Sequence, residues 1–141
     1  MKVSSVAVIG AGTMGNGIAQ SFAQHGFQVT LIDVSSGALE KALSTISKNL
    51  DRLIAKETIR KEARDSILKN IMTSTDLPSA VSRVDLVIEA VTENASVKYG
   101  LFRQLDPIVQ HHCILATNTS SISITDIAAQ TGRPDRVIGM H

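Results

Sequence analysis

Short continuous apolar runs alternate along the chain with longer segments in which apolar residues recur at every third or fourth position. A run of the first kind is typical of a strand buried on both faces, and a repeat of the second kind indicates a helix with one face on the core. The pattern predicts strands at 6–9, 29–32, 71–74, 84–89, 113–116 and 136–140. It predicts helices at 13–25, 38–56, 58–69, 95–105 and from Ser123 onward, with a helical turn at 78–82.

This alternation predicts an α/β fold with a doubly wound, mostly parallel sheet that carries helices on both faces. The segment 38–69 predicts a helical hairpin inserted after the second strand. The expected apolar side of the helix at 13–25 consists of Met14, Ile18 and Phe22 together with Ala19 and Ala23. Ser123 and Asp126 have the spacing of a capping box at a helix start. The apolar face of the helix at 38–56 consists of Leu39, Leu43, Ile46, Leu50 and Leu53.

Composition limits the classes of partner. The 141 residues suit one domain, and 43% hydrophobic residues with a net charge of +1 exclude general disorder. The balanced charge gives no overall attraction to nucleic acid or to an acidic membrane surface, so we expect neither partner. Aromatic residues make up only 3% and Trp is absent, which disfavours a base-stacking platform. The N-terminus has no signal-peptide core, no apolar run approaches the ~20 residues of a membrane span, and we expect a cytoplasmic protein.

The single cysteine, Cys113, allows neither an intramolecular disulfide nor a cysteine-based zinc site. His111 and His112 precede it, but adjacent residues that enter a strand point to opposite faces and do not converge on one ion. We therefore predict no metal site and interpret the two histidines as loop residues.

A glycine-rich turn follows the first predicted strand directly and opens the first predicted helix. It reads Gly10-Ala11-Gly12-Thr13-Met14-Gly15 and matches G-x-G-x-x-G. The first glycine permits the tight turn, the second lets backbone amides approach a pyrophosphate, and the third lets the helix pack closely on the strand. The start of the helix adds unpaired N–H groups and a partial positive charge. We therefore predict a Rossmann-type domain in which these six residues bind a dinucleotide; a plain glycine-rich turn is the alternative.

Asp33 ends the second predicted strand, 18 residues after Gly15. A carboxylate there accepts hydrogen bonds from a ribose diol and repels the 2′-phosphate of NADP. The next residues, 34–36, include no Arg that could bind such a phosphate. The sequence therefore predicts NAD as the cofactor.

Polar and small residues gather where the predicted strands end. They are Gly10–Gly15, Asp33, Glu89–Glu93, Asn118–Ser120 and His141. Ligands of open α/β sheets bind outside the carboxyl ends of the strands, so this edge is the expected site.

Four stretches together resemble the N-terminal domain of the 3-hydroxyacyl-CoA dehydrogenase family, closest to its bacterial 3-hydroxybutyryl-CoA branch. They are Gly10–Ala19, Val87–Asn94, Thr117–Ser121 and Val137–His141, in the order in which the family has them. The resemblance implies NAD-dependent oxidation of a (S)-3-hydroxyacyl-CoA to the 3-oxoacyl-CoA. It implies His141 as the catalytic base, and histidine suits this role because its ordinary pKa lies near neutrality.

The resemblance also implies roles for four other residues. Ser120 matches an active-site serine that hydrogen-bonds substrate and cofactor, and Asn118 is a neighbouring polar contact. Glu93 and Lys98 match positions near the nicotinamide end of NAD. Simpler interpretations exist for three of them: a Ser/Thr-rich turn for Ser120, a carboxylate at a helix start for Glu93 and a solvated lysine for Lys98. Glu89 is interpreted as structural.

The predicted hairpin carries Lys48, Arg52 and Lys56 at four-residue steps, hence on one helix face. The resemblance implies that this face lies beside coenzyme A, that Lys56 contacts it, and that Asn49 stands where some members have a serine. An ordinary solvated face is the alternative.

In the family a helical second domain follows this segment, with the acidic partner of the histidine and the dimer interface. We expect residues 1–141 to be the NAD-binding half of a homodimeric enzyme whose helical domain is absent from this chain. The alternatives are a related hydroxyacid or sugar-acid dehydrogenase, and an NAD-binding module or redox sensor without turnover.

Overall fold

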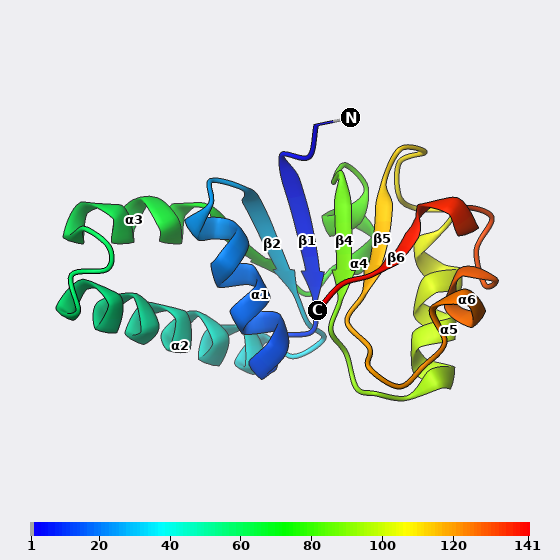
Figure 1. The fold of residues 1–141 in the computed structure, drawn as a ribbon, viewed down its shortest axis with the longest axis horizontal. Coiled ribbons are helices and arrows are strands. Elements are labelled where there is room, and N and C mark those ends of the chain that lie inside the picture. The colour runs from blue at the N-terminus through cyan, green and yellow to red at the C-terminus, as the bar shows by residue number, and fades with distance from the viewer. Residues whose placement is uncertain (1) are drawn as a thin grey trace.

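Six parallel strands form one sheet, and helices cover both of its faces (Figure 1). A computed structural model describes residues 2–141. The strands are β1 (Ser5–Ile9), β2 (Gln28–Ile32), β3 (Ile71–Ser74), β4 (Leu86–Glu89), β5 (Ile114–Thr117) and β6 (Val137–Gly139). The helices are α1 (Thr13–Gln24), α2 (Ser36–Ala55), α3 (Lys61–Lys69), α4 (Leu77–Val81), α5 (Ala95–Leu105), α6 (Ile124–Ala128) and a short 3₁₀ turn at Pro134–Arg136. The α/β, doubly wound, Rossmann-type prediction is confirmed.

The strands lie in the order β3-β2-β1-β4-β5-β6, so the chain winds outward from β1 on one side and then from β4 on the other. The direction of winding reverses between β1 and β4, and in such sheets a crevice opens at that point, outside the carboxyl ends. The register brings these ends level, because Ile9 pairs with Ile32 and with Glu89, and Glu89 pairs with Thr117. Residues that follow each strand therefore meet along one edge.

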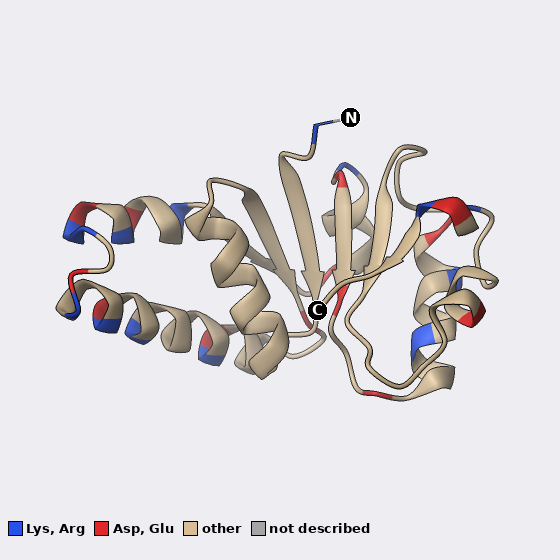
Figure 2. Cartoon of the chain, viewed as in Figure 1, with Lys and Arg blue, Asp and Glu red and all other residues tan. Residues whose placement is uncertain are grey.

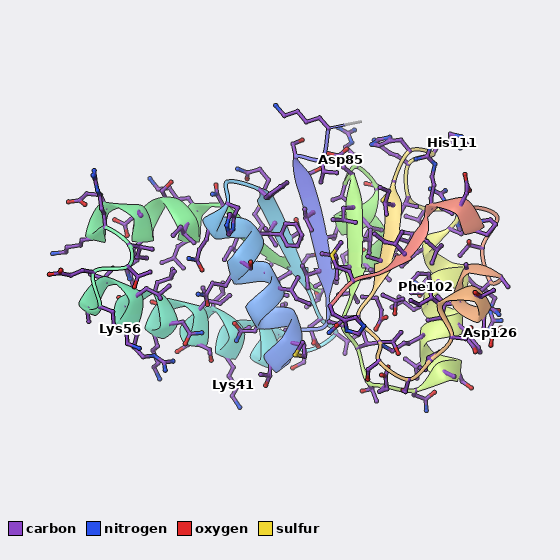
Figure 3. All side chains as sticks on the ribbon, in the orientation of Figure 1. Lys41, Lys56, Asp85, Phe102, His111 and Asp126 are labelled. Atoms are coloured by element: carbon purple, nitrogen blue, oxygen red, sulfur yellow. The ribbon has the colours of Figure 1, made fainter. Side chains whose placement is uncertain are left out.

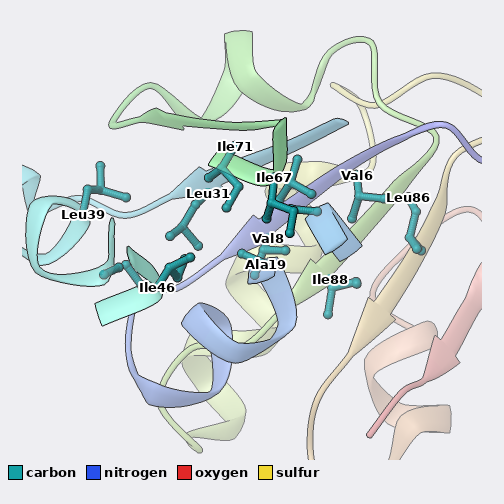
Figure 4. Packing of buried hydrophobic residues seen from close by; sticks show 14 of the residues in the cluster. Val6, Val8, Ala19, Leu31, Leu39, Ile46, Ile67, Ile71, Leu86 and Ile88 are labelled. Carbon is teal, nitrogen blue, oxygen red and sulfur yellow. The ribbon is translucent and has the colours of Figure 1, made fainter. Parts of the chain in front are cut away.

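Alternate residues of the strands fill two separate cores. Val6 and Val8 of β1 lie in one core, together with Leu31 of β2 and Ile46 of α2 (Figure 4). Their neighbours Ala7 and Ile9 face the other side, where α5 packs through Phe102 and Leu105. Charged side chains concentrate on the helices and on the loops between elements (Figure 2). This distribution explains the continuous apolar runs in the sequence, because a central parallel strand is covered on both faces.

The inserted hairpin consists of α2 and α3, which project from one side of the sheet (Figure 1). The structure differs from the prediction at the turn, because α3 starts at Lys61 and not at residue 58. Glu57 has a φ of 57°, and Glu57 N and Thr58 N donate to Ile54 O and Leu53 O. These are the two bonds of a Schellman motif, which ends α2 with a left-handed residue. The apolar period of the sequence carries no signal for such a turn.

One core prediction for α1 is wrong. Met14 is 57% exposed, whereas Ala19 and Ala23 are buried on the face that packs on the sheet. Small residues occupy this face because α1 lies very close to β1, and the larger Ile18 and Phe22 are only partly buried at its margin. The predicted last strand is also shorter, since the 3₁₀ turn takes Arg136 and β6 ends at Gly139.

The close contact between α1 and β1 depends on two glycines. A Cβ at Gly15 would lie 1.6 Å from the carbonyl oxygen of Gly10, and a Cβ at Gly10 would lie 2.6 Å from the carbonyl oxygen of Ala90. Gly10 also has a φ of +107°, which residues with a side chain rarely adopt. In the turn that joins β1 to α1, only glycine therefore fits at positions 10 and 15.

We predict that Gly15→Ala destabilises the protein by about 3 kcal/mol, because the added methyl group collides with backbone that cannot move aside. The matched control is Gly17→Ala in the same helix, where a Cβ would meet nothing within 4 Å. That substitution should be neutral or stabilise by up to about 1 kcal/mol through helix propensity. Urea unfolding of both variants measures the difference, and equal stabilities would contradict the packing argument.

Candidate functional site

Three hollows follow one another along the carboxyl edge of the sheet. The first, of about 430 Å³, has walls from Gly10, Asp33 and Val91. The second, of about 470 Å³, lies between α1 and α2 and shares Asp33 with the first. The third, of about 380 Å³, shares Val91 with the first and contains Ser120 and His141. The predicted edge site is thus a connected series of hollows around the start of α1.

Asp33 and the glycine-rich turn are in direct contact. Asp33 Oδ2 accepts a hydrogen bond of 2.9 Å from Ala11 N, and Asp33 Oδ1 accepts one of 2.9 Å from Ser35 N. The turn and the carboxylate therefore lie on the same side of the molecule, as the sequence analysis requires. Ser35 in turn caps α2, since its Oγ accepts a hydrogen bond from Ala38 N.

The residues around the turn fit a dinucleotide. No side chain caps the start of α1 at Gly12, and a Cβ at Gly12 would meet nothing within 4 Å. The space in front of the first amides of the helix is therefore open to a diphosphate, which those unpaired amides favour. On the other side of Asp33 the first hollow has mainly apolar walls, including Val34, Leu77 and Leu101, which suit a flat ring.

A buried cluster of charges lies behind the third hollow. Lys98 Nζ is 2.8 Å from Glu89 Oε1 and 3.1 Å from Glu93 Oε1. The Lys98 side chain is only 1% exposed, so its interpretation as a solvated lysine is wrong. Glu89 is fully buried; it also accepts hydrogen bonds from Val91 N and from Thr117 Oγ1, at 2.9 Å and 2.6 Å. Its burial and its ion pair agree with the interpretation of Glu89 as structural, and Thr117 is a partner in this site that the sequence did not indicate.

Glu93 joins this cluster to the loop after β5. Its Oε1 accepts a hydrogen bond of 2.8 Å from Thr119 Oγ1, and its Oε2 accepts from Ser120 N at 3.2 Å and from Ser121 Oγ at 3.1 Å. The hydrogen bond from Thr119, followed by that from Lys98, lowers the pKa of Glu93 to about 2. The carboxylate is therefore ionised at neutral pH, and it fixes the backbone that carries Ser120.

The third hollow brings together most of the predicted reactive side chains. Its walls include Met14, Glu93, Asn118, Ser120 and His141. Met14 lies here because it points away from the core. The other four residues share one sequence signal, a polar residue shortly after the end of a buried strand. Thr117 was missed because it lies inside the strand, where a threonine is common on packing grounds alone.

The predicted coenzyme A residues separate in the structure. Asn49 lies in the wall of the second hollow, where its Nδ2 donates to Gln20 Oε1 and its Oδ1 accepts from Arg52. Lys56 caps the far end of α2, about 10 Å further along the helix (Figure 3). Lys48, Arg52 and Lys56 are all exposed, and Lys56 does not reach the hollows.

Neither a membrane-spanning helix nor a metal-binding cluster is present in the described residues. Within residues 2–141, none of the helices has the length and hydrophobicity that a membrane span requires. The same residues contain no group of three or more His, Cys, Asp or Glu side chains placed to hold a metal ion. His112 instead pairs with Asp85 at 2.8 Å, at the opposite end of the sheet.

Comparison with known proteins identifies the family. The sequence profile described as "3-hydroxyacyl-CoA dehydrogenase, NAD binding domain" matches residues 5–141. The chain belongs to this family. Its domain therefore binds NAD, in agreement with the open start of α1 and with Asp33.

Individual relatives agree with this family. A 3-hydroxybutyryl-CoA dehydrogenase of Clostridioides difficile is 45% identical over 136 residues, which are 96% of this chain and 48% of the relative. A 3-hydroxyadipyl-CoA dehydrogenase of Escherichia coli is 45% identical over 141 residues, 100% of this chain and 30% of the relative. The crystal structure of (S)-3-hydroxybutyryl-CoA dehydrogenase PaaH1 from Ralstonia eutropha superposes with a TM-score of 0.95 at 46% identity, over 99% of this chain and 49% of that one. The chain thus spans half or less of the length of these 3-hydroxyacyl-CoA dehydrogenases.

The buried lysine of this dehydrogenase domain gives a stability prediction. Lys98→Met leaves two carboxylates buried or half-buried without their cation, so we expect a loss of about 3–5 kcal/mol of unfolding free energy. Lys48→Met, on the exposed face of α2, should change it by less than about 0.5 kcal/mol. Adding Glu89→Gln to Lys98→Met should restore part of the loss. Urea unfolding measures all three, and equal effects of the two lysine variants would contradict the buried ion pairs.

Proposed function

We propose that the intact protein is an NAD-dependent 3-hydroxyacyl-CoA dehydrogenase, which interconverts a (S)-3-hydroxyacyl-CoA and a 3-oxoacyl-CoA. The observation that carries the proposal is the third hollow. It places a histidine, a serine and an ionised glutamate at the carboxyl edge, next to the turn that suits a diphosphate. A base beside a cofactor site is the minimum that oxidation of an alcohol requires.

Backbone and side chains share the binding of NAD in this proposal. The amides of the turn from Gly10 to Gly15 hold the diphosphate, and Asp33 accepts the hydroxyl groups of the adenosine ribose. Glu93, Lys98, Asn118 and Ser120 form the nicotinamide side, with Lys98 acting through Glu93 because it is buried. When bound, NAD supplies the oxidising chemistry by accepting a hydride from the substrate carbon.

His141 and Ser120 carry the proton chemistry in this proposal. An imidazole nitrogen of His141 takes the proton of the substrate hydroxyl during oxidation and returns it during reduction. Ser120 Oγ hydrogen-bonds the same substrate oxygen and so orients it toward the histidine. The hydrogen bond from Ser120 N to Glu93 Oε2 supports this role, because it fixes the backbone of the serine.

The second hollow supports an acyl-CoA as substrate. It lies between α1 and α2 beside the proposed diphosphate site, and its walls include the polar side chains of Thr45 and Asn49. Lys56 and its neighbours on α2 form a basic face to which the phosphates of coenzyme A bind. The relatives act on acyl groups of different length, and we assign 3-hydroxybutyryl-CoA as the substrate on the similarity to the proteins of that name.

The proposal also covers the domain organisation, the oligomeric state and the localisation of the protein. Residues 1–141 form its NAD-binding domain, and a helical domain that this chain does not include forms a homodimer in the intact enzyme. Cytoplasmic localisation is part of the proposal, with neither a nucleic acid nor a membrane as partner. The balanced net charge of +1 supports it.

The cofactor assignment predicts a clear preference. Calorimetry should show that NAD binds at least about 100-fold more tightly than NADP, because the Asp33 carboxylate lies where the 2′-phosphate of NADP would bind. Asp33→Ala should reduce this preference to within about tenfold. Asp65→Ala, which removes an exposed carboxylate from α3, should leave it unchanged. Equal affinities in the unchanged protein would contradict the role of Asp33.

The base assignment predicts a selective loss of turnover. His141→Gln in the intact protein should lower kcat by about 10²–10⁴-fold, the usual contribution of a general base. Affinity for NAD should stay within about threefold, since the glutamine keeps a polar side chain of similar size. His111→Gln, at the opposite end of the sheet, is the control (Figure 3). An assay with 3-hydroxybutyryl-CoA in which His141→Gln keeps full turnover would remove this residue as the base.

A further inference from the structure

The buried cluster behind the third hollow carries an excess of negative charge. It consists of two carboxylates, Glu89 and Glu93, on the single ammonium group of Lys98. The ionised state of Glu93 is secured by four donors: Thr119 Oγ1, Ser120 N, Ser121 Oγ and Lys98 Nζ. Glu89 is paired in the same way with Lys98, Val91 N and Thr117 Oγ1. With all three groups charged, the cluster has a net charge of −1.

One negative member of the cluster lies nearer to the hollow than the positive one. The side chain of Glu93 is 40% exposed and lies in the wall, whereas Lys98 and Glu89 are buried behind it. Of the described residues in this wall, Glu93 is the only Asp, Glu, Lys or Arg. The start of α5 next to Glu93 offsets only part of the charge, about half a unit. A molecule in the third hollow therefore meets a negative field.

The nicotinamide ring belongs in this hollow if the proposed function is right. The diphosphate lies at the start of α1, between the two halves of the sheet, and Asp33 holds the adenosine on the β2 side. The other half of the dinucleotide must then extend over the ends of β4 and β5, where Glu93, Ser120 and His141 lie. The oxidised ring is a cation and the reduced ring is neutral, so the two forms respond differently to a nearby charge.

We propose that the cluster of Glu89, Lys98 and Glu93 makes the site select the oxidised cofactor over the reduced one. Glu93 supplies the negative charge at the ring, and Lys98 and Glu89 are positioning residues that hold it there. The inference rests on the proposed function and deepens it. By linkage, a site that binds the cation more tightly makes the bound cofactor harder to reduce, and so favours the alcohol side of the on-enzyme equilibrium.

The positioning role follows from the geometry of Lys98. Its ammonium group bridges the two carboxylates and also lies 3.5 Å from the carbonyl oxygen of Asn118. These contacts connect the end of β4, the start of α5 and the loop after β5. The buried ammonium group of Lys98 therefore fixes the carboxylate of Glu93 at the hollow. The carboxylate keeps this position when the cofactor binds.

The test compares affinities for the two redox forms in the intact protein. Calorimetry with NAD and fluorescence titration with NADH give the ratio of the two dissociation constants in the unchanged protein and in each variant. Glu93→Gln should lower the preference for the oxidised form by about tenfold, the effect of one unit charge a few ångström from a cation in a partly solvated site. Glu89→Gln should lower it about threefold, because that charge lies further back.

Two control variants separate charge from shape. Glu93→Asp keeps the charge but shortens the side chain, so it should weaken both forms of the cofactor while leaving their ratio within about twofold. Glu62→Gln removes one exposed carboxylate from α3 and should leave both affinities unchanged. If Glu89→Gln does not fold, Glu93→Gln on its exposed loop still decides the question.

The outcomes are distinct. The inference is supported if the preference for NAD over NADH falls in Glu93→Gln and stays as in the unchanged protein in Glu93→Asp. Equal weakening of both forms in Glu93→Gln, with an unchanged ratio, overturns it and leaves only a structural role for the cluster, while NAD binding by the unchanged protein keeps the proposed function. A protein that binds neither form overturns the proposed function and this inference together.

Discussion

The carbonyl oxygen of Gly10 and the α-carbon of Gly15 lie so close that no side chain fits between them, and the cofactor site depends on this contact. It lets α1 begin directly above the end of β1 and keeps its first amides at the crevice between β1 and β4. Ala19, seen in Figure 4, extends the same close approach along the helix. Ala23, one turn further on, is buried as well. The helix could not move outward to admit larger residues without withdrawing its amides from the diphosphate site.

The part of the site around His141 differs from the part around Gly12 in the kind of group that it presents. Around Gly12 the exposed polar groups are backbone amides, which secondary structure places without help from side chains. Around His141 the groups are side chains on loops, and a buried ion cluster holds those loops in place. Buried ion pairs of this kind add little stability compared with apolar packing, so their value lies in fixed positions and in charge. The cluster with Lys98 provides both.

The three hollows along the sheet edge differ in the residues that form their walls. The first hollow, beside Asp33, has mainly apolar walls, and the second, between α1 and α2, has both apolar and polar residues in its walls. The third hollow contains Glu93 and His141. Because all strands are parallel and end level, one short edge collects residues from distant parts of the sequence, from Gly10 to His141. This arrangement allows a domain of 141 residues to present so many functional groups together.

The sequence by itself determined the order of strands and helices along the chain, the glycine turn with Asp33 beside it, and the family, because each rests on local pattern or spacing. Hydrophobic periodicity could not locate the Schellman turn at Glu57, since a left-handed residue leaves no apolar signal. It also misplaced Met14, because periodicity does not report how closely a helix approaches its sheet. Only the tertiary structure decided that Lys98 is buried between Glu89 and Glu93, since the pairing joins residues whose charges look solvent-exposed along the chain. The energy of a charge depends on what surrounds it in space, and folding alone brings those surroundings together.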